Sequence, residues 1–295
     1  MFTFLPRPII AIFIAISYTL LTFLLPIPIL IVGLFYYLIP NKRWRIYCDR
    51  LMQAIGKGWG IHSNIILALF TRIHWNINGF NHSLISQKSY LLIANHQSWA
   101  DIIIIQKVFN QKLPLCRYFI KKSLTYVPII GWCCKLLHFP AMKRYSKALL
   151  EKKPELKGKD TETTRKACQI FQHIPVTLIN FAEGTRFTLA KKKLQQSPYE
   201  YLLLPRAGGI SFTLSALADY LQTILNVTII YDQHSPTLWD IFTGKIKTIT
   251  VDIKEIPVTK ALIGDYQNDV EYRKQFQDWL NQLWKEKDKL IKSSY

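Results

Sequence analysis

The chain has 295 residues, of which 49% are apolar and 13% aromatic, and its formal net charge is +19. So much apolar and aromatic sequence excludes a disordered chain, and the length suffices for one large domain or two small ones. The excess of positive charge requires an anionic partner, which is a nucleic acid, an anionic membrane surface or an anionic substrate.

The first forty residues form a separate hydrophobic unit. Residues 2–38 are almost all apolar, and Arg7 is the only charged residue before Lys42. The prolines of Pro26-Ile27-Pro28 divide this stretch into arms of about 17 and about 10 apolar residues. The first arm is at the lower limit for crossing a bilayer and the second is too short. We therefore expect residues 1–40 to form a membrane-inserted helical hairpin; a cleaved signal peptide and buried core helices are the alternatives.

Basic residues flank the hydrophobic unit. Arg7 lies at one end, and Lys42, Arg43 and Arg45 lie at the other. By the positive-inside tendency, both ends face the cytoplasm. Residues 41–295 are therefore expected to form a cytoplasmic domain on the membrane surface.

Beyond residue 45, apolar runs typical of strands alternate with helical patterns. Strands are expected at residues 71–78, 90–94, 113–120, 176–181 and 226–231, and helices at 45–69, 98–109 and 161–173. This order predicts an α/β fold with a largely parallel central sheet covered by helices. Lysine-rich residues 147–160 and 190–198 are expected to be exposed connectors.

The chain ends in an amphipathic pattern. Its apolar residues at helical spacing are Tyr272, Phe276, Trp279, Leu283 and Trp284. We expect a terminal helix whose apolar face packs on the domain, with contact to the membrane surface as the alternative.

Five cysteines do not predict a disulfide framework, because their number is odd and two are adjacent. They are Cys48, Cys116, Cys133, Cys134 and Cys168. No cysteine or histidine pair has the spacing of zinc ligands. We expect buried thiols in a reducing compartment, and no metal or redox cofactor.

The run Asn95–Asp101 follows a predicted buried strand and opens a predicted helix, where the active sites of α/β proteins form. With His96 just before the helix and Asp101 in its first turns, the carboxylate can reach back to the imidazole. Such an aspartate fixes the tautomer and stabilises the imidazolium, which suits a general base. Taken alone, the spacing also fits a helix cap with a local hydrogen bond.

A second run, Phe181–Arg186, follows another predicted strand. Gly184 permits an unusual backbone angle, and Arg186 can bind phosphate through two hydrogen bonds. Glu183 is suited to orienting Arg186 or to binding a substrate hydroxyl. Taken alone, a strand-to-loop turn with a surface ion pair also explains the run.

Together, the two runs resemble the glycerolipid acyltransferase family, which includes the 1-acylglycerol-3-phosphate acyltransferases. The residues that match its N-H-x4-D and E-G-T-R motifs are Asn95, His96, Asp101, Glu183, Gly184, Thr185 and Arg186. Residues 119–124, with Lys121 and Lys122, resemble its lysine-bearing segment, and Arg144 resembles the arginine end of that segment. Residues 204–209 resemble its P-[KR]-x-G stretch. The match is closest to a bacterial probable-acyltransferase subgroup and to lysocardiolipin-type acyltransferases.

The resemblance implies direct acyl transfer from acyl-CoA or acyl carrier protein to a lysophospholipid hydroxyl. It implies that His96 is the general base and that Asp101 holds it. The residues that it implies for substrate binding are Glu183, Gly184, Thr185, Arg186, Lys122, Lys121 and Arg144. For a bacterial member, it implies attachment to the cytoplasmic face of the inner membrane.

The acceptor implied by the resemblance is lysophosphatidate. Ala182 stands where the family usually has proline, and Phe187 follows Arg186 in place of the common serine, so another acceptor is an alternative. That acceptor is lysophosphatidylglycerol or lysocardiolipin. A membrane-anchored lipid-binding protein is the non-enzymatic alternative, and a nucleic-acid partner is not expected because the chain has no recognised module for one.

Overall fold

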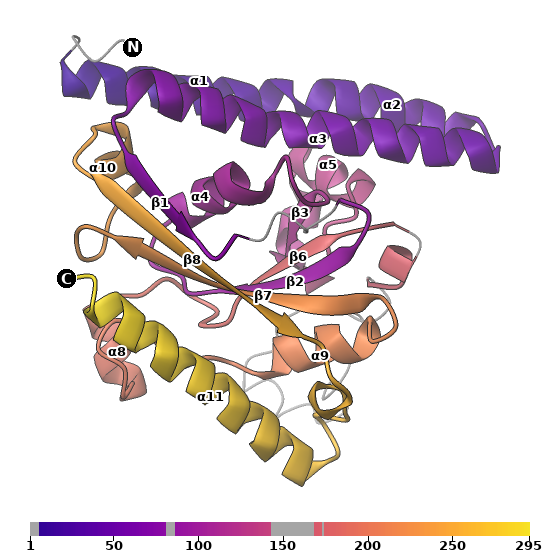
Figure 1. Ribbon diagram of the computed structural model, residues 1–295. Helices are drawn as coiled ribbons and strands as arrows, with labels where there is room; N and C mark the ends of the chain where they lie inside the picture. The colour runs from indigo at the N-terminus through magenta and orange to yellow at the C-terminus, as the bar shows by residue number, and fades with distance from the viewer. Residues whose placement is uncertain (1–5, 81–85, 143–167, 173) are drawn as a thin grey trace.

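A computed structural model describes residues 6–80, 86–142, 168–172 and 174–295 (Figure 1). The α-helices are α1 (Arg7–Leu24), α2 (Pro26–Leu38), α3 (Lys42–Phe70), α4 (Ala100–Phe109), α5 (Ile130–Leu136), α8 (Leu189–Gln195), α9 (Gly208–Ala216), α10 (Leu238–Phe242) and α11 (Val270–Lys292). The strands are β1 (His74–Asn78), β2 (Ser89–Ala94), β3 (Cys116–Tyr118), β4 (Ile120–Lys121), β5 (Ala141–Met142), β6 (Thr177–Phe181), β7 (Leu221–Tyr231) and β8 (Thr248–Pro257). Short 3-10 turns are η1 (Lys122–Tyr126), η3 (Gln169–Gln172) and η4 (Lys260–Leu262).

The central sheet has the strand order β1-β8-β7-β2-β6-β3, and only the β7–β8 pair is antiparallel. The predicted α/β fold with a largely parallel sheet is therefore confirmed. β4 and β5 form a separate two-stranded ribbon. Strand β8 was not predicted, although Ile249, Val251 and Ile253 alternate with polar residues as in a strand with one buried face.

Helices cover both faces of the sheet, because the central strands are apolar on both sides. Tyr90, Leu92 and Ala94 of β2 face a core shared with α1, α3 and α4. Leu91 and Ile93 face a second core shared with α9 and α11. The result is a three-layer domain that holds the ends of β2 and β6 rigidly (Figure 1).

The hairpin turn predicted at Pro26-Ile27-Pro28 is wrong. Leu25 has α-helical backbone angles and Pro26 opens α2, a position where proline needs no amide hydrogen bond. Helix α2 therefore continues along the line of α1, and together they form an apolar helix long enough to cross a membrane by length and composition (Figure 1). The chain reverses later, at residues 39–41, where the Asn41 side chain caps α3 by accepting a hydrogen bond from the Trp44 amide (3.1 Å).

Helix α3 returns beside α1 and α2 and separates much of them from the sheet (Figure 1). Gly33 allows α2 to pack closely on α5. A Cβ atom at this position would lie only 2.5 Å from the Leu136 side chain. One side of the α1–α2 helix is buried against the domain. Its other side exposes large apolar residues: Ile9, Ile12, Phe13, Ile16, Leu20, Phe23, Leu24, Ile27, Ile31, Leu34 and Phe35.

The predicted terminal helix is α11, and its apolar face packs on the sheet. Phe276, Leu280 and Trp284 are buried in the core shared with β2 and β7. Packing on the domain, rather than contact with a membrane, is thus confirmed for this face. Four of the five cysteines are buried, as expected for inert thiols. The connector predicted at residues 147–160 and most of the helix predicted at 161–173 lie outside the described residues.

Candidate active site

The two sequence motifs emerge side by side because they follow adjacent parallel strands. Strands β2 and β6 pair with Ala94 opposite Phe181. His96 and Glu183 each lie two residues beyond these paired ends, at the carboxyl edge of the sheet. This is the edge where α/β proteins bind their ligands.

Asn95 fixes the direction in which the chain leaves β2. Its side-chain amide donates a hydrogen bond to the Ile229 carbonyl (2.9 Å), and its side-chain oxygen accepts one from the Ile229 amide (2.8 Å). The fully buried side chain thus replaces a backbone pairing with β7 at the point where β2 ends. The asparagine of the first motif therefore holds the His96 backbone in place.

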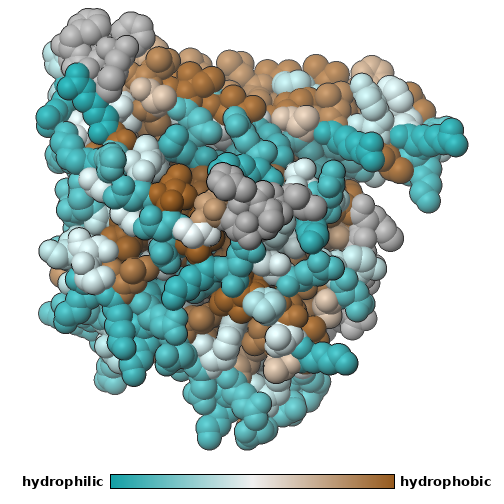
Figure 2. Space-filling model, viewed as in Figure 1, coloured by the Kyte–Doolittle hydropathy of each residue, from teal (hydrophilic) through white to brown (hydrophobic). Residues whose placement is uncertain are grey.

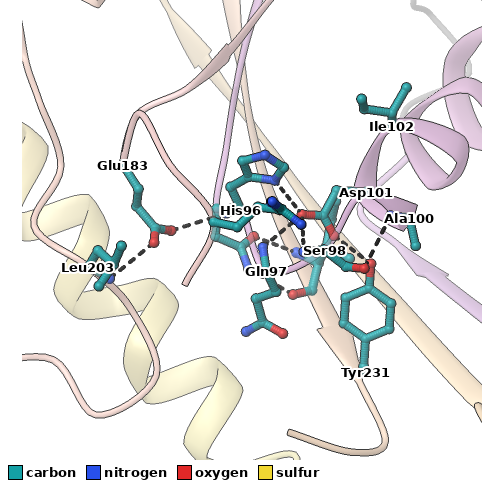
Figure 3. Close-up of polar contacts among 12 residues, drawn as sticks. His96, Gln97, Ser98, Ala100, Asp101, Ile102, Glu183, Leu203 and Tyr231 are labelled. Atoms are coloured by element: carbon teal, nitrogen blue, oxygen red, sulfur yellow. Dashed lines mark hydrogen bonds and ion pairs between the residues drawn. The ribbon is translucent and has the colours of Figure 1, made fainter. Parts of the chain in front are cut away.

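His96 and Asp101 are in direct contact (Figure 3). The Nδ1 atom of His96 lies 2.7 Å from Oδ2 of Asp101, which is fully buried in the first turn of α4. The same oxygen accepts hydrogen bonds from the backbone amides of Gln97 (2.7 Å) and Ser98 (3.0 Å). The structure thus brings together the pair that the sequence predicted.

A residue that sequence reasoning had not assigned to this pair completes the environment of Asp101. Tyr231, at the end of β7, donates its phenolic hydrogen to Oδ1 of Asp101 (Figure 3). Burial raises the pKa of Tyr231 well above its ordinary value, so the hydroxyl remains a donor. The Asp101 carboxylate therefore accepts from one ring nitrogen, two amides and one hydroxyl.

The imidazole of His96 is oriented for proton transfer. Its ring stacks on Phe181, with the centroids 4.1 Å apart and the planes 14° from parallel. With the Nδ1 hydrogen directed at Asp101, Nε2 is the nitrogen with a lone pair. The side chain is 13% exposed, so only a small part of it is open to solvent.

Glu183 lies behind the His96 backbone. Its two carboxylate oxygens accept hydrogen bonds from the amides of His96 and Leu203, each at 3.1 Å (Figure 3). The side chain is fully buried, and burial raises its pKa to about 8, although the two amides partly oppose this. Glu183 therefore joins two loops, in place of the contact with Arg186 or a substrate hydroxyl that we expected.

Gly184 turns the chain away from the end of β6. Its φ of +68° is a left-handed conformation that glycine adopts readily and other residues do not. The Gly184 amide donates to the Phe181 carbonyl (2.9 Å), which closes the turn. This turn directs Thr185 and Arg186 back towards the first motif.

Arg186 reaches across to the first motif. Its exposed guanidinium lies over the indole ring of Trp99, 4.7 Å from the ring centroid. Lys191 donates hydrogen bonds to the Thr185 hydroxyl (2.7 Å) and to the Arg186 carbonyl (3.0 Å). Residues 190–198 were predicted to be a connector, but Lys191 belongs to helix α8 and supports the arginine.

The structure does not bring the other predicted phosphate-binding residues into this network. Lys121 is exposed on β4 and Lys122 opens η1. Within the described part of the chain, neither ammonium group forms a hydrogen bond or ion pair. Arg144 lies outside the described residues.

An apolar cavity lies close to the stacked rings. Tyr118 stacks on Phe181, with the two ring centroids 6.0 Å apart. The Tyr118 side chain also lines the cavity. The cavity has a volume of about 230 Å³ and lies among α1 to α5 and β3. Its further lining residues include Pro26, Ile29, Ile102 and Cys133.

Residues 77–230 match the family model described as Acyltransferase, which is about half of the chain and contains both motifs. The chain is 27% identical over 209 residues to 1-acyl-sn-glycerol-3-phosphate acyltransferase 3 of Arabidopsis thaliana, a match that covers 63% of this chain and 52% of the relative. It is 25% identical over 240 residues to 2-acyl-1-lysophosphatidylinositol acyltransferase of Saccharomyces cerevisiae, covering 69% and 60%.

Among solved structures, the 1-acyl-sn-glycerophosphate acyltransferase PlsC of Thermotoga maritima aligns with a TM-score of 0.47 and 15% identity, over 94% of this chain and 97% of that one. The chain spans about 60% of the length of the first curated relatives that it matches.

Proposed function

The chain belongs to the Acyltransferase family, and we propose that it is an O-acyltransferase that moves a fatty acyl group from a thioester to the hydroxyl of a lysophospholipid. The observation that supports this best is the His96–Asp101 contact at the open edge of the sheet. In the proposed reaction, Nε2 of His96 takes the proton of the acceptor hydroxyl while its oxygen attacks the thioester carbonyl. The tetrahedral intermediate then expels the thiolate, which takes this proton from the His96 imidazolium and leaves as the thiol.

We propose lysophosphatidate as the acceptor. Arg186 is exposed beside the His96 motif, and a guanidinium binds a phosphate monoester through two hydrogen bonds. The similarity to a 1-acyl-sn-glycerol-3-phosphate acyltransferase supports the same acceptor. The similarity to a lysophosphatidylinositol acyltransferase favours a second candidate, a lysolipid whose phosphate is a diester.

The apolar cavity is the proposed site for the acyl chain. Tyr118 lines the cavity and stacks on Phe181, which in turn stacks on His96. From Tyr118 the cavity extends between the amino-terminal helices and α4. Burial of methylene groups there contributes about 0.8 kcal/mol each. Acyl-CoA and acyl carrier protein are the proposed donors, and the transfer itself needs no cofactor because the thioester is already activated.

We propose that α1 and α2 attach the protein to one face of a membrane without standing upright in it. At about 1.5 Å per residue, their 32 residues extend for about 48 Å, which exceeds the roughly 30 Å hydrocarbon core. The helix also packs along the domain over its length, through α3, α5 and α10. A position in the interface, with the exposed apolar side in the lipid, suits both observations.

The proposed membrane face is the cytoplasmic one, which in a bacterium belongs to the inner membrane. Figure 2 shows a band of hydrophobic side chains over α1 and α2 and a hydrophilic surface beneath it. Basic residues Arg7, Lys42 and Arg45 lie at the two ends of the α1–α2 helix, consistent with attraction to anionic lipid heads.

Acyl transfer by the full chain in detergent–lysolipid micelles tests this proposal. Lysophosphatidate is compared with lysophosphatidylinositol and lysophosphatidylglycerol, with acyl-CoA and acyl carrier protein as donors. We expect His96→Ala to lower the rate at least 100-fold, because positioned general bases contribute about 10² to 10⁴. His74→Ala, which removes an exposed imidazole on β1, is the matched control.

Transfer to another lysolipid alone would keep the mechanism and change the acceptor. Absence of transfer to every acceptor, or transfer that is unaffected by His96→Ala, would favour a lipid-binding protein without catalytic activity.

A further inference from the structure

Three cationic residues gather at one end of the α1–α3 layer, away from the His96 motif. Arg7 begins α1, Arg72 follows the end of α3, and Lys247 lies in the loop between α10 and β8. All three line one cavity of about 150 Å³. No acidic side chain is among the residues that line it in the described part of the chain.

Two acidic residues that contact the chain around Lys247 are held by other groups. Asp232 accepts hydrogen bonds from the backbone amides of Lys247 (2.7 Å) and Thr248 (2.9 Å). Asp240 forms an ion pair with Lys245 (3.0 Å) and accepts from the Thr237 amide (2.9 Å). Arg7 and Lys247 therefore place positive charge at the cavity that favours an anionic ligand.

The Lys247 ammonium is held at the cavity by the fold. It donates to the Gly244 carbonyl (2.6 Å) across the turn that ends α10. Gly244 has a φ of +65°, which permits this turn, and it lines the cavity beside Thr243. The remaining ammonium hydrogens of Lys247 are available to a ligand.

An apolar surface adjoins the charged cavity. Ile10 and Phe242 form part of the wall of the cavity. Next to it, Ile9 and Phe13 of α1 are exposed, and the Phe13 ring packs on Phe70 with centroids 5.0 Å apart. These residues begin the hydrophobic band that Figure 2 shows over α1 and α2. A ligand with an anionic head and apolar chains can therefore contact both surfaces.

We propose that this cavity binds the phosphate group of an anionic membrane phospholipid, with the lipid chains along the exposed side of α1. This inference rests on the proposed attachment of α1 and α2 to a membrane. A phosphate held between the start of α1 and the end of α3 fixes the rotation of the α1–α2 helix in the interface. It thereby sets how the domain is presented to the membrane.

Flotation of the full chain with vesicles tests the site. One set of vesicles contains phosphatidylcholine alone and the other also contains phosphatidylglycerol. The variant Arg7→Gln/Lys247→Gln is compared with Lys274→Gln/Lys285→Gln, which removes two exposed charges from α11, on the opposite side of the domain (Figure 1). Arg72 is left intact because it has a partner within the protein.

We expect the site variant to bind the anionic vesicles about tenfold more weakly, since each basic residue at an anionic surface contributes substantially to binding. Its binding to phosphatidylcholine vesicles and its acyl transfer in micelles should equal those of the unmodified protein. The variant Arg7→Lys/Lys247→Arg should restore binding, because it keeps both charges.

Equal losses in the two glutamine variants would overturn the site and leave only a general charge effect. A rise in melting temperature with inorganic phosphate, without a preference for anionic vesicles, would also overturn it in favour of a soluble anion. Failure of the unmodified protein to bind either vesicle would overturn both the site and the membrane attachment, whereas acyl transfer in micelles tests the catalytic proposal independently.

Discussion

Asp101 is a buried carboxylate whose oxygens are fully occupied by donors. His96, Gln97 and Ser98 donate to Oδ2, and Tyr231 donates to Oδ1. Each hydrogen bond to an ionised carboxylate stabilises its charge and fixes its orientation. Tyr231 therefore acts through Asp101 as a positioning residue for the proposed general base.

Removal of that hydroxyl should slow the reaction. In Tyr231→Phe, Asp101 loses one of its donors, so the carboxylate that contacts His96 is held less firmly. We expect kcat to fall about tenfold, with the KM for the lysolipid nearly unchanged. The measurement is the steady-state kinetics of acyl transfer in micelles.

Tyr199→Phe provides the control for this substitution. The Tyr199 hydroxyl is also hydrogen-bonded in a mostly buried site, but it donates to the Asn281 carbonyl of α11 (3.2 Å). An equal loss of kcat in both variants, or an unchanged kcat in Tyr231→Phe, would show that Tyr231 does not act on the His96–Asp101 pair.

The His96–Asp101 contact was predictable because both residues lie within one short run and one helix start brings them together. Tyr231 was not assigned to the pair, since it is 130 residues further along the chain and reaches Asp101 only through the sheet. The position of Glu183 was misjudged for a related reason. Sequence shows that a carboxylate follows a strand, but only the fold shows that the carboxylate is buried under two backbone amides.

Among the elements, α11 stabilises β7 through an unusual buried lysine. The Lys287 ammonium donates to the Val227 carbonyl and to the Thr228 hydroxyl (3.3 Å), beside the end of β2. Burial lowers the pKa of Lys287 to about 7, although the charges of Asp252 and Glu183 oppose this. The folded protein therefore keeps this amine neutral at a pH where the unfolded chain protonates it.

The free energy of unfolding should rise with pH because of Lys287. Between about pH 8.5 and 10, Lys287 binds a proton in the unfolded chain but not in the fold, so it adds up to about 1.4 kcal/mol per pH unit to the free energy of unfolding. This range lies above the pKa of about 8 that burial gives Glu183, which acts with the opposite sign below that pH. Urea unfolding of Lys287→Met should lack this rise.

The control is Lys289→Met, which removes an exposed lysine from the same helix. Its free energy of unfolding should follow the pH dependence of the unmodified protein. If Lys287→Met kept the same slope as the unmodified protein, Lys287 would be protonated in the fold across this range and the argument from burial would fail.

Elements with a simple apolar pattern were predicted well. Strand β2 is an unbroken apolar run, and α11 has aromatic residues at helical spacing. Strand β8 was missed although its apolar residues alternate with polar ones, and its polar residues Asp252 and Lys254 face α11. The continuity of α1 and α2 was missed because two prolines suggest a turn, yet Pro26 and Pro28 lie in the first turn of a helix, where proline is tolerated.

In the molecule as a whole, the two sides of the apolar amino-terminal helix lie in different environments. Its buried side contributes Ile10, Ala11 and Ile14 to the main core. Its opposite side exposes Ile16 and Phe13. The same helix is therefore part of the folded domain and the proposed membrane anchor. A detachable anchor would not contribute side chains to the core.

Two substitutions that are two residues apart, on opposite sides of α1, should separate these surfaces. Ile14 is fully buried, so Ile14→Ala should lower the free energy of unfolding by about 2 to 5 kcal/mol through the cavity that it leaves. Ile16 is 53% exposed, so Ile16→Ala should leave stability in detergent nearly unchanged and weaken vesicle binding. Urea unfolding in micelles, together with flotation, measures both effects. Equal destabilisation would contradict the two-sided arrangement.

The packing of α1 also has a consequence for the order in which the chain can fold. Tyr18, near the amino terminus, stacks on Phe242 of α10 with ring centroids 5.6 Å apart. The ribosome makes the first helix early, but this partner emerges only after most of the chain has been synthesised. Until then, the core side of α1 has no complete binding surface of its own. A nascent helix already resting in the lipid would be shielded during this wait, and the domain would close onto the membrane rather than fold first and bind later.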